Sequence, residues 1–508
     1  MGKGDGTPPH RLNVTRNLSR WVAVGASLFC GALILYATRR DPVLSPDSIS
    51  YLSTATHLRS GKGFTEFTGQ PLTVFGPVLP IVLAVGGRSL LWARVVCMAG
   101  VAGATWLMFV ILARRVRPWT AVAAAALFGL SQGLVRVGST VWSETPYILI
   151  ALAALAVLTK EPLTERRAAL GGLLCGLGFL TRYAGIGLII TGSVVVAMAA
   201  MSLERRQALR LLSIHLGAGA VTCALWLVRN LIATGEPLGP RFSGGAPEGL
   251  QVLMREAANA TGELVLGNRA DAAQRLRGGG VILILLLLAA VAAVTTIALG
   301  SRELLDVAMV VFAITSVFIP VIARKMTASD IDFRVMSPLL VPIVYTLAVC
   351  LDAVRIKPLA LVAAVALGSW WGYQGVAMAD RVPEIVAYGA GSRTQFSREL
   401  FDLIDTLPAA ANVMTNSPQR VWWQNDRNPT LFGFVRPRAG NSNYPLSPAD
   451  TLKYACKPDT FLAWFEGGDG PTVRRPDLAA IIDVTLVQTV SRGTLYRLTP
   501  HDRSQCAK

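Results

Sequence analysis

The feature that most constrains this chain is a run of 19 uncharged, mostly aliphatic residues at positions 281–299. A helix of that length, rising about 1.5 Å per residue, crosses the hydrocarbon core of a bilayer, which is about 30 Å thick. Similar blocks recur along the chain, so that 52% of its 508 residues are hydrophobic and only 16% are charged. The sequence therefore predicts a polytopic α-helical membrane protein and excludes a disordered or purely soluble chain.

A basic N-terminal tail, residues 1–20, precedes the first apolar stretch at 21–38. Because no small-residue cleavage site follows that stretch, we interpret the stretch as a membrane anchor and not as a signal peptide. We predict about eleven spans in all, since arginines concentrate in the loops that this count assigns to the cytoplasm, as the positive-inside rule requires. The ten further spans are at approximately 90–113, 118–136, 144–159, 168–182, 184–202, 209–229, 280–299, 304–323, 335–353 and 356–374.

The basic character of the chain, with a formal net charge of +17, first suggests a nucleic acid partner. The basic residues, however, lie in small groups between apolar blocks and form no face with interleaved aromatic side chains, so we predict no nucleic acid partner. The seven cysteines include no CxxC pair and the four histidines are scattered, which argues against a zinc site. The sequence also contains neither a P-loop nor a dinucleotide-binding glycine motif after a strand.

Three segments on the predicted outer side are too long to be simple connections: 39–88, 232–279 and the C-terminal region. The C-terminal region has strand-like runs with turn residues between them, which predicts a small α/β domain outside the membrane. Cys456 and Cys506 lie there, and an oxidising compartment allows them to form a disulfide, with two free thiols as the alternative. The predicted organisation is a cytoplasmic tail at 1–20, a membrane domain at 21–374 and an extracytoplasmic domain at 375–508.

The segment 39–88 begins with residues that predict a helix carrying a carboxylate at its N-terminus. Ser45 can cap the helix, Pro46 suits its first position and Asp47 lies in its first turn. Apolar residues follow at helical spacing, so we predict an amphipathic helix along the membrane surface. A proline-rich apolar stretch at 70–84 then predicts a re-entrant or interfacial segment. Asp47 also has a plainer explanation, because the helix macrodipole alone favours an acidic residue in the first turn.

A second carboxylate and several arginines lie at the ends of later spans on the same predicted side. Glu144 begins one span, where acidic residues at membrane depth are often functional, although Ser143 and Glu144 also form an ordinary helix start. Arginines at three other span ends could converge on a phosphate, which guanidinium groups bind bidentately. For each arginine alone, snorkelling to lipid headgroups is the alternative. These arginines are Arg182, Arg229 and Arg334.

The segment PDSISYLSTATHLRSGKGFTEFTGQP, residues 46–71, resembles the first-loop pattern of the GT-C superfamily of membrane glycosyltransferases. The resemblance is to the branch that contains the dolichyl-phosphate-mannose–protein mannosyltransferases and the lipid A aminoarabinose transferases. Four further segments match that branch in the same order, so the resemblance covers about residues 20–350. They are SETPY at 143–147, GLGFLTRYAG at 176–185, WLVRN at 226–230 and DIDFRVMSPLLVP at 330–342.

The resemblance implies an enzyme of the bacterial plasma membrane. It implies that a sugar moves, with inversion at its anomeric carbon, from a polyprenyl-phosphate donor to an envelope glycan, glycolipid or protein on the outer face. By position, Asp47 corresponds to the catalytic carboxylate and Glu144 to an acidic residue of the second outer loop. The family usually has two adjacent acidic residues where this chain has Asp47 and Ser48, so Asp41 is a second candidate. The other predicted site residues are the phosphate ligands Arg182, Arg229, Arg334 and Lys62, and the substrate-site candidates Tyr51, His57, Asp330 and Asp332.

The chemistry can be stated without the resemblance. A carboxylate that removes the proton of an attacking hydroxyl accelerates transfer by roughly 10²–10⁴, and arginines near the membrane surface stabilise the departing phosphate. A divalent metal beside Asp47 and Glu144 is compatible with this scheme but is not required by it. Two alternatives remain: a transporter or flippase whose charges line a pathway, and a scaffold that binds glycan. A transporter predicts ionisable residues in mid-span, whereas here they cluster at the predicted outer ends.

Overall fold

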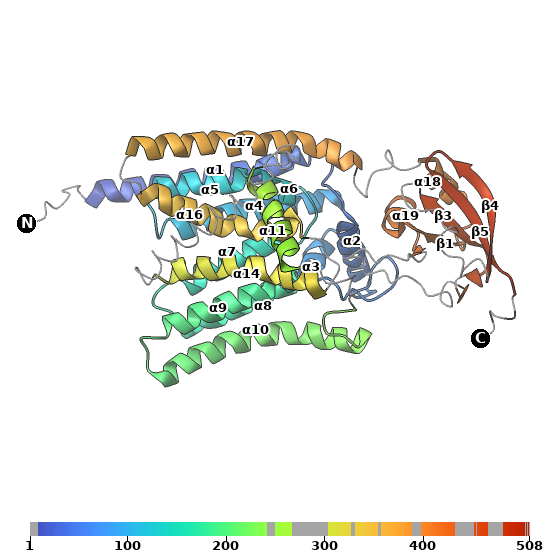
Figure 1. Cartoon of the computed structure of the whole chain (residues 1–508), viewed down its shortest axis with the longest axis horizontal. Coiled ribbons are helices and arrows are strands. Elements are labelled where there is room, and N and C mark those ends of the chain that lie inside the picture. Colours follow the sequence, from blue (N-terminus) through green and yellow to red (C-terminus); the bar gives the residue numbers. More distant parts are fainter. Residues whose placement is uncertain are drawn as a thin grey trace, which may run out of the picture.

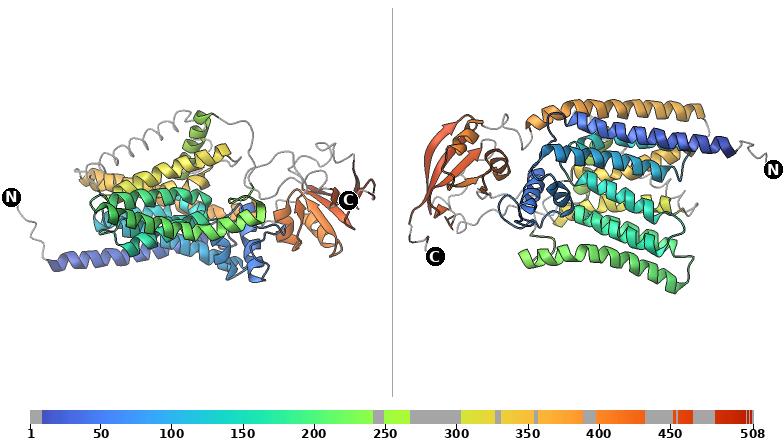
Figure 2. Two further views of the ribbon diagram at one scale, coloured as in Figure 1. Left: turned by 90° about the horizontal axis from the view of Figure 1, so that it is seen from below. Right: turned by 180° about the vertical axis from the view of Figure 1, so that it is seen from behind.

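The computed structural model describes residues 9–240, 249–266, 303–326, 331–353, 357–388, 398–431, 452–453, 455–465, 481–502, 504 and 506. Most of its long helices run roughly side by side along the long axis of the molecule, and a small sheet lies beyond one end of them (Figures 1 and 2). At that end lie two short helices, α2 (Pro46–Arg59) and α3 (Val78–Ala84). We call it the head end of the bundle.

The bundle is built from neighbouring pairs of helices. The N-terminal helix α1 (Pro9–Ala37) packs against α4 (Leu90–Leu112) and α5 (Pro118–Leu130), and α8 (Glu165–Thr181) packs against α10 (Arg205–Thr234). The other helices are α6 (Gln132–Gly138), α7 (Glu144–Leu158), η1 (Tyr183–Gly185), α9 (Ile186–Ala199), α11 (Leu250–Leu266), α14 (Leu304–Met326), α15 (Phe333–Met336), η2 (Ser337–Leu339), α16 (Leu340–Ala353) and α17 (Lys357–Tyr388).

Helices α8 and α10 approach closely because glycines form part of the contact between them. A Cβ atom added at Gly172 would lie 2.1 Å from the backbone oxygen of His215, and one at Gly176 would lie 2.8 Å from the Cβ of Thr222. Small residues at such crossings let helix backbones pack tightly in membrane proteins. Substitution of either glycine would therefore force the two helices apart.

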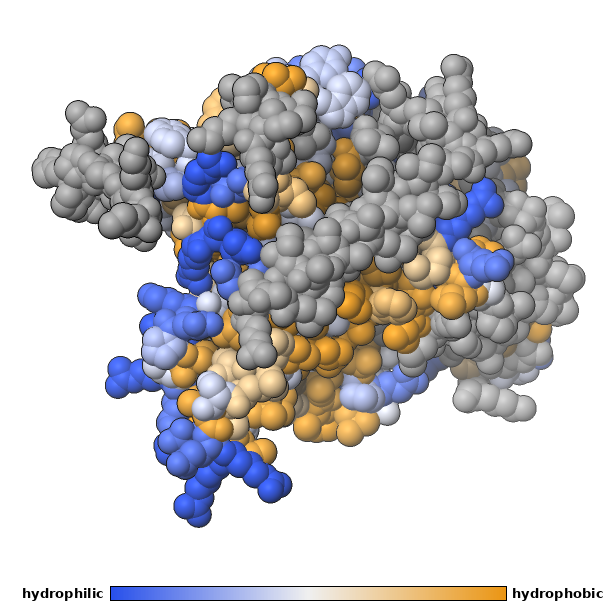
Figure 3. Space-filling view, turned by 60° about the vertical axis from the view of Figure 1, so that its left-hand side comes forward, coloured by the Kyte–Doolittle hydropathy of each residue, from blue (hydrophilic) through white to orange (hydrophobic). Residues whose placement is uncertain are grey.

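Ten of the eleven predicted apolar segments are helical in the structure, and the eleventh, 280–299, lies outside the described residues. Within the described ranges, five helices are long and apolar enough to cross a membrane. A sixth crossing is present if α5 and α6, which meet at a 53° bend, form one span. Apolar side chains cover much of the visible face of the bundle, and hydrophilic side chains gather mainly at its left-hand side (Figure 3). The count of eleven crossings stays a prediction.

The bend between α5 and α6 has a local cause. The side chain of Ser131 accepts a hydrogen bond from the backbone nitrogen of Leu134, at 3.3 Å, and so caps a new helix. The backbone of Ser131 is extended, which interrupts the helical path. The break puts α6 near the start of α7.

The C-terminal unit has the mixed α/β character that its strand-like runs predict. Its sheet has the order β2-β1-β3-β5-β4, in which β1 pairs in parallel with β2 and β3, whereas β5 pairs antiparallel with β3 and β4. Cys456 and Cys506 form a disulfide with their Cα atoms 5.5 Å apart. The location of the unit outside a membrane and the boundary at 375 stay predictions. Its elements are α18 (Arg398–Asp405), β1 (Asn412–Thr415), α19 (Pro418–Asn425), β2 (Thr430–Leu431), β3 (Thr460–Phe465), β4 (Ile482–Val490) and β5 (Gly493–Pro500).

The helix α2 begins as predicted but is not the amphipathic surface helix that we expected. Ser45 is its N-cap, and Ser48 completes a capping box with it. Nine of its 14 residues are buried on several faces. The expectation was wrong because α3 covers one side of α2 and the C-terminal unit, through α19, covers another. The predicted interfacial stretch at 70–84 contributes to this cover, since α3 falls within it.

One arginine fastens the C-terminal unit to the head end. Arg88, which follows α3, pairs with Asp426 at 2.6 Å and donates to the backbone oxygens of Trp422 and Trp423. Its guanidinium carbon lies 4.7 and 4.8 Å from the centroids of these two indole rings. Trp422 in turn packs against Phe67 of the segment 39–88. The sheet is thus joined to the bundle through this segment.

Candidate functional site

Three contacts tie the start of α2 to the segment that leads into α7. The indole nitrogen of Trp142 donates to Oγ of Ser45 at 2.6 Å, and the hydroxyl of Tyr51 donates to Oγ of Ser143 at 3.3 Å. The backbone of Val43 also bridges to Thr140. These contacts bring the first turns of two helices, and with them Asp47 and Glu144, into one region of the head end.

Arg334 joins the two carboxylates. Its Nη1 donates to Oδ2 of Asp47, and its Nε lies 3.5 Å from Oε1 of Glu144 and 3.8 Å from Oδ2 of Asp332. Arg182 approaches Glu144 from another direction, with its Nη1 2.8 Å from Oε1. These five side chains are called the carboxylate–arginine cluster below. With three carboxylates and two guanidiniums, its formal charge is −1.

The local backbone explains why Arg334 points into the cluster. It lies on α15, a helix of four residues whose N-cap is Asp332. Oδ1 of Asp332 accepts a hydrogen bond from the backbone nitrogen of Val335 at 2.9 Å. The cap fixes the direction of this short helix, and its other carboxylate oxygen remains close to Arg334.

Burial makes the electrostatics of the cluster strong. The side chain of Glu144 is 3% exposed, that of Arg182 13% and that of Asp47 16%. Charges that are withdrawn from water interact through a lower effective dielectric than surface charges do. The same burial, with the negative charges of Asp47 and Glu144, raises the pKa of Tyr51. Its phenol therefore stays protonated and can donate a hydrogen bond.

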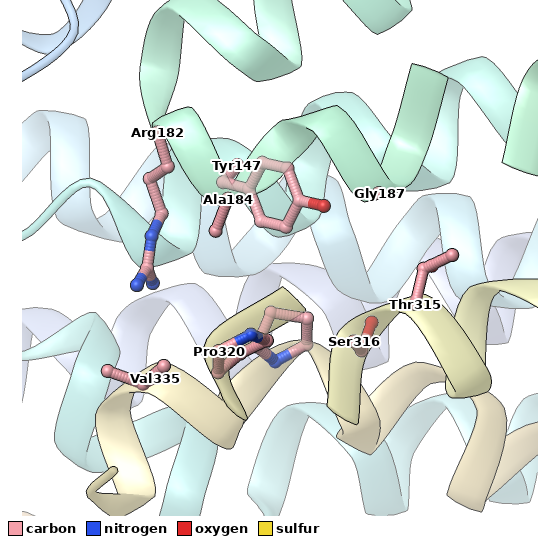
Figure 4. A pocket seen from close by; sticks show the side chains of 9 residues that line it. Tyr147, Arg182, Ala184, Gly187, Thr315, Ser316, Pro320 and Val335 are labelled. Carbon is pink, nitrogen blue, oxygen red and sulfur yellow. The ribbon is translucent and has the colours of Figure 1, made fainter. Parts of the chain in front are cut away.

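A narrow hollow lies on one side of the cluster, lined by residues of α7, η1, α9, α14, α15 and η2. Arg182 extends into it toward Pro320 and Val335, and Tyr147 lies beside it (Figure 4). The free volume is about 10 Å³. That is room for about one water molecule, so a sugar phosphate would require the lining helices to separate.

Arg229, a predicted phosphate ligand, lies apart from the cluster and binds backbone. It donates to the carbonyl oxygens of Phe64, at 2.8 Å, and Leu72, and to Oδ1 of Asn230. Its guanidinium also lies 4.8 Å from the ring centroid of Trp226. These contacts hold the segment 39–88 against α10. A role in binding phosphate stays a prediction.

The structure also locates the remaining predicted residues. Lys62 is exposed in the turn after α2, and Nδ1 of His57 lies 3.0 Å from the backbone oxygen of Thr65. Burial lowers the pKa of His57, which keeps its imidazole neutral. Asp41 lies just beyond α1, and burial raises its pKa. In the part of the chain that the structure describes, Asp41 forms no ion pair with Arg182 or Arg334. Asp330 lies outside the described residues.

Solved structures of other proteins resemble this chain. It is similar in structure to ArnT from Cupriavidus metallidurans bound to undecaprenyl phosphate, with a TM-score of 0.60, 12% sequence identity and coverage of 94% of this chain and 97% of that one. The chain has the GT-C fold. This confirms the fold that the ordered motifs of residues 20–350 predicted. No family model matches the chain, and no curated protein sequence does.

Two other GT-C structures are also similar. The oligosaccharyltransferase of Archaeoglobus fulgidus in complex with Zn and sulfate has a TM-score of 0.53 and 14% identity, over 93% of this chain and 72% of that one. Its AglB structure in complex with an inhibitory peptide and a dolichol-phosphate has a TM-score of 0.52 and 11% identity, over 93% of this chain and 74% of that one. At such low identities, these matches support the fold alone.

Sequence reasoning missed Trp142, which borders the carboxylate–arginine cluster. The ring centroid of Trp142 lies 5.1 Å from the guanidinium carbon of Arg334, and its indole nitrogen donates a hydrogen bond to Ser45, the N-cap of α2. The available signal was its position directly before the SETPY motif. In the described ranges, no three or more His, Cys, Asp or Glu side chains gather in a group that could hold a metal ion.

Proposed function

We propose that the chain is an inverting glycosyltransferase that moves a sugar from a polyprenyl-phosphate donor to a hydroxyl group, with Asp47 as general base. The observation that carries this proposal is the meeting of Asp47 and Glu144 with Arg182 and Arg334 in one buried cluster. A GT-C fold around this cluster supports the assignment, because ArnT with this fold was solved with undecaprenyl phosphate bound.

The proposed reaction is a single displacement. The acceptor oxygen attacks the anomeric carbon as the bond from that carbon to the phosphate oxygen breaks, so the configuration inverts. The electron pair of that bond leaves with the polyprenyl phosphate, and the acceptor proton passes to Asp47. A base in this position contributes roughly 10²–10⁴ to the rate.

The two arginines have distinct proposed roles. Arg182 extends into the hollow between α9 and α14 and would bind the donor phosphate there once these helices separate. Arg334 would turn from Asp47 toward the leaving phosphate, whose growing charge it stabilises. Glu144 keeps both guanidiniums in place through its Oε1.

The proposed setting is the bacterial plasma membrane, with the head end and the C-terminal unit on the outer side. The acceptor is a hydroxyl of an envelope glycan, glycolipid or protein. The apolar side chains on the face of the bundle seen in Figure 3 are consistent with a lipid-linked donor that enters from the bilayer. A transporter of the same lipid would move the donor intact, so consumption of the donor separates the two functions.

The test uses the full chain in liposomes that contain polyprenyl-phosphate mannose, arabinose or aminoarabinose, with envelope extract as acceptor. Mass spectrometry should detect release of polyprenyl phosphate with one of these donors. Asp47→Asn should reduce the release at least about 100-fold, whereas Asp41→Asn, the matched control from the same segment, should keep it. Intact donor in every assay, or a fully active Asp47→Asn variant, would contradict the proposal. Envelope glycans and lipids from a deletion strain then identify the sugar and acceptor by the missing mass.

A further inference from the structure

A second and much larger cavity lies on the side of Trp142 that faces the C-terminal unit. Its volume is about 450 Å³, which is in the range of small-molecule sites. Ser45 and Pro46, the two residues before Asp47, form part of its wall, and so does Trp142. The cavity therefore borders Pro46, the residue next to the proposed base Asp47. It is separate from the narrow hollow that Arg182 lines.

The cavity has two unlike walls. Met378, Val382 and Ile385 of α17 form an apolar wall, and the segment at the start of α19 forms a polar one. That polar segment comes from the C-terminal unit, so the cavity exists only because this unit is fastened to the bundle. Its contribution consists of Asn416, Ser417, Gln419 and Arg420.

The charged side chains that line the cavity are both arginines, Arg136 and Arg420, and no carboxylate is among its described lining residues. Arg136 forms an ion pair with Glu263 of α11, whose Oε1 lies 2.5 Å from Nη1 of Arg136 and compensates part of its charge. Arg420 donates to Oγ of Ser417 at 3.0 Å and is half-buried. Burial lowers the pKa of Arg420 to about 10, so the guanidinium remains charged at neutral pH.

We propose that this cavity receives the acceptor, and that the acceptor carries a phosphate or carboxylate group which Arg420 binds. The inference rests on the proposed function, because it assigns a substrate to the same site. A guanidinium in a partly desolvated cavity binds an oxyanion more strongly than it would in water. The apolar wall of α17 suits the non-polar part of such a molecule, such as a lipid chain or the face of a sugar ring. The C-terminal unit thus selects the acceptor.

The test measures access to the cavity directly and does not depend on transfer. Ile385→Cys introduces a thiol in the apolar wall, in a Cys350→Ser background, because Cys350 is the exposed one among the free cysteines. The full chain is placed in phosphatidylcholine nanodiscs, and the rate of labelling by a neutral maleimide is followed. Three soluble probes are added in turn: glucose 6-phosphate, glucuronate and neutral glucose.

At least one of the two anionic sugars should slow labelling about tenfold, and glucose should not. The anion that protects identifies the acidic group of the acceptor. Arg420→Gln should remove the protection, whereas Arg398→Gln should keep it. Arg398 is a suitable control because it belongs to the same unit, is 79% exposed and pairs with Asp402 outside the cavity.

Three results would overturn the inference. They are equal labelling with and without both anions, equal protection in Arg420→Gln, and full protection by undecaprenyl phosphate in the nanodisc without any sugar. The last result would assign the cavity to the donor. An Asp47→Asn variant separates this inference from the proposed function, because loss of transfer with retained protection supports both, whereas retained transfer with retained protection contradicts only the role of Asp47.

Discussion

The buried pair between Arg182 and Glu144 gives the sharpest quantitative prediction. Both side chains are largely withdrawn from water, and their charged atoms lie 2.8 Å apart. Removal of one partner from such a pair leaves a buried charge without compensation and typically costs about 3–5 kcal/mol. We therefore expect Glu144→Gln and Arg182→Gln each to lower the free energy of unfolding by about 3 kcal/mol, the lower end, because glutamine keeps one hydrogen bond and because Glu144 still has Arg334 at 3.5 Å when Arg182 is removed.

The double variant should cost little more than either single one, because its second substitution removes the buried charge that lost its nearest partner in the first. The coupling energy from the cycle should then be about 2–3 kcal/mol. Reversible unfolding of the full chain in mixed micelles with increasing dodecyl sulfate measures all four free energies.

The chain offers a matched control in Glu165 and Arg210, which join α8 to α10. Their charged atoms are 3.0 Å apart, but the side chains are 49% and 68% exposed. The same cycle at this pair should give at most about 1 kcal/mol. If the losses at Glu144 and Arg182 simply add, or if the exposed pair couples as strongly as the buried one, burial is not the source of the strength of the cluster.

The other predictions concern Trp142, Arg88 and His57. Trp142→Phe removes the hydrogen-bond donor to Ser45 but keeps an aromatic ring beneath Arg334. The rate of sugar transfer should fall about tenfold, which corresponds to the loss of one hydrogen bond of about 1.4 kcal/mol, while expression stays unchanged. Arg88→Ala should weaken the attachment of the C-terminal unit to the bundle. If that attachment loses about 1–2 kcal/mol of free energy, hydrogen exchange of the backbone amides in α19 should accelerate roughly tenfold. Unchanged exchange would contradict the fastening role of Arg88. Burial lowers the pKa of His57, so the folded state binds its proton less readily than the unfolded state. The contribution of His57 to the free energy of unfolding is therefore complete above the pKa of the unfolded state, about 6.5, and decreases as the pH falls below that value. His57→Gln should flatten this part of the stability profile, as measured by unfolding between pH 5 and 8.

The sequence predicted the helices well because their signals are local. Long uncharged blocks form helices without reference to the rest of the chain, and the residues Ser45, Pro46 and Asp47 specify a helix start by themselves. The strand-like runs near the C-terminus likewise became β4 and β5. Each of these depends on neighbours within a few positions.

The parts that failed or were missed depend on partners far along the chain. The cover of α2 comes from α3 and from α19, which begins more than 350 positions later. Nothing local distinguishes Arg334, which contacts Asp47 from 287 positions away, from Arg229, which holds backbone carbonyls. All three span-end arginines looked alike in sequence, and only the fold shows which of them face carboxylates.

The shared use of Arg334 by three carboxylates has a consequence for the timing of catalysis. In the resting molecule this guanidinium is engaged by Asp47, Glu144 and Asp332. An incoming anionic donor competes with these carboxylates for the same cation, so binding of the donor would break the contact between Arg334 and Asp47. Under the proposed function, release of the base is thus coupled to occupancy of the donor site, and the acceptor hydroxyl meets a free carboxylate only when a sugar is present to receive it.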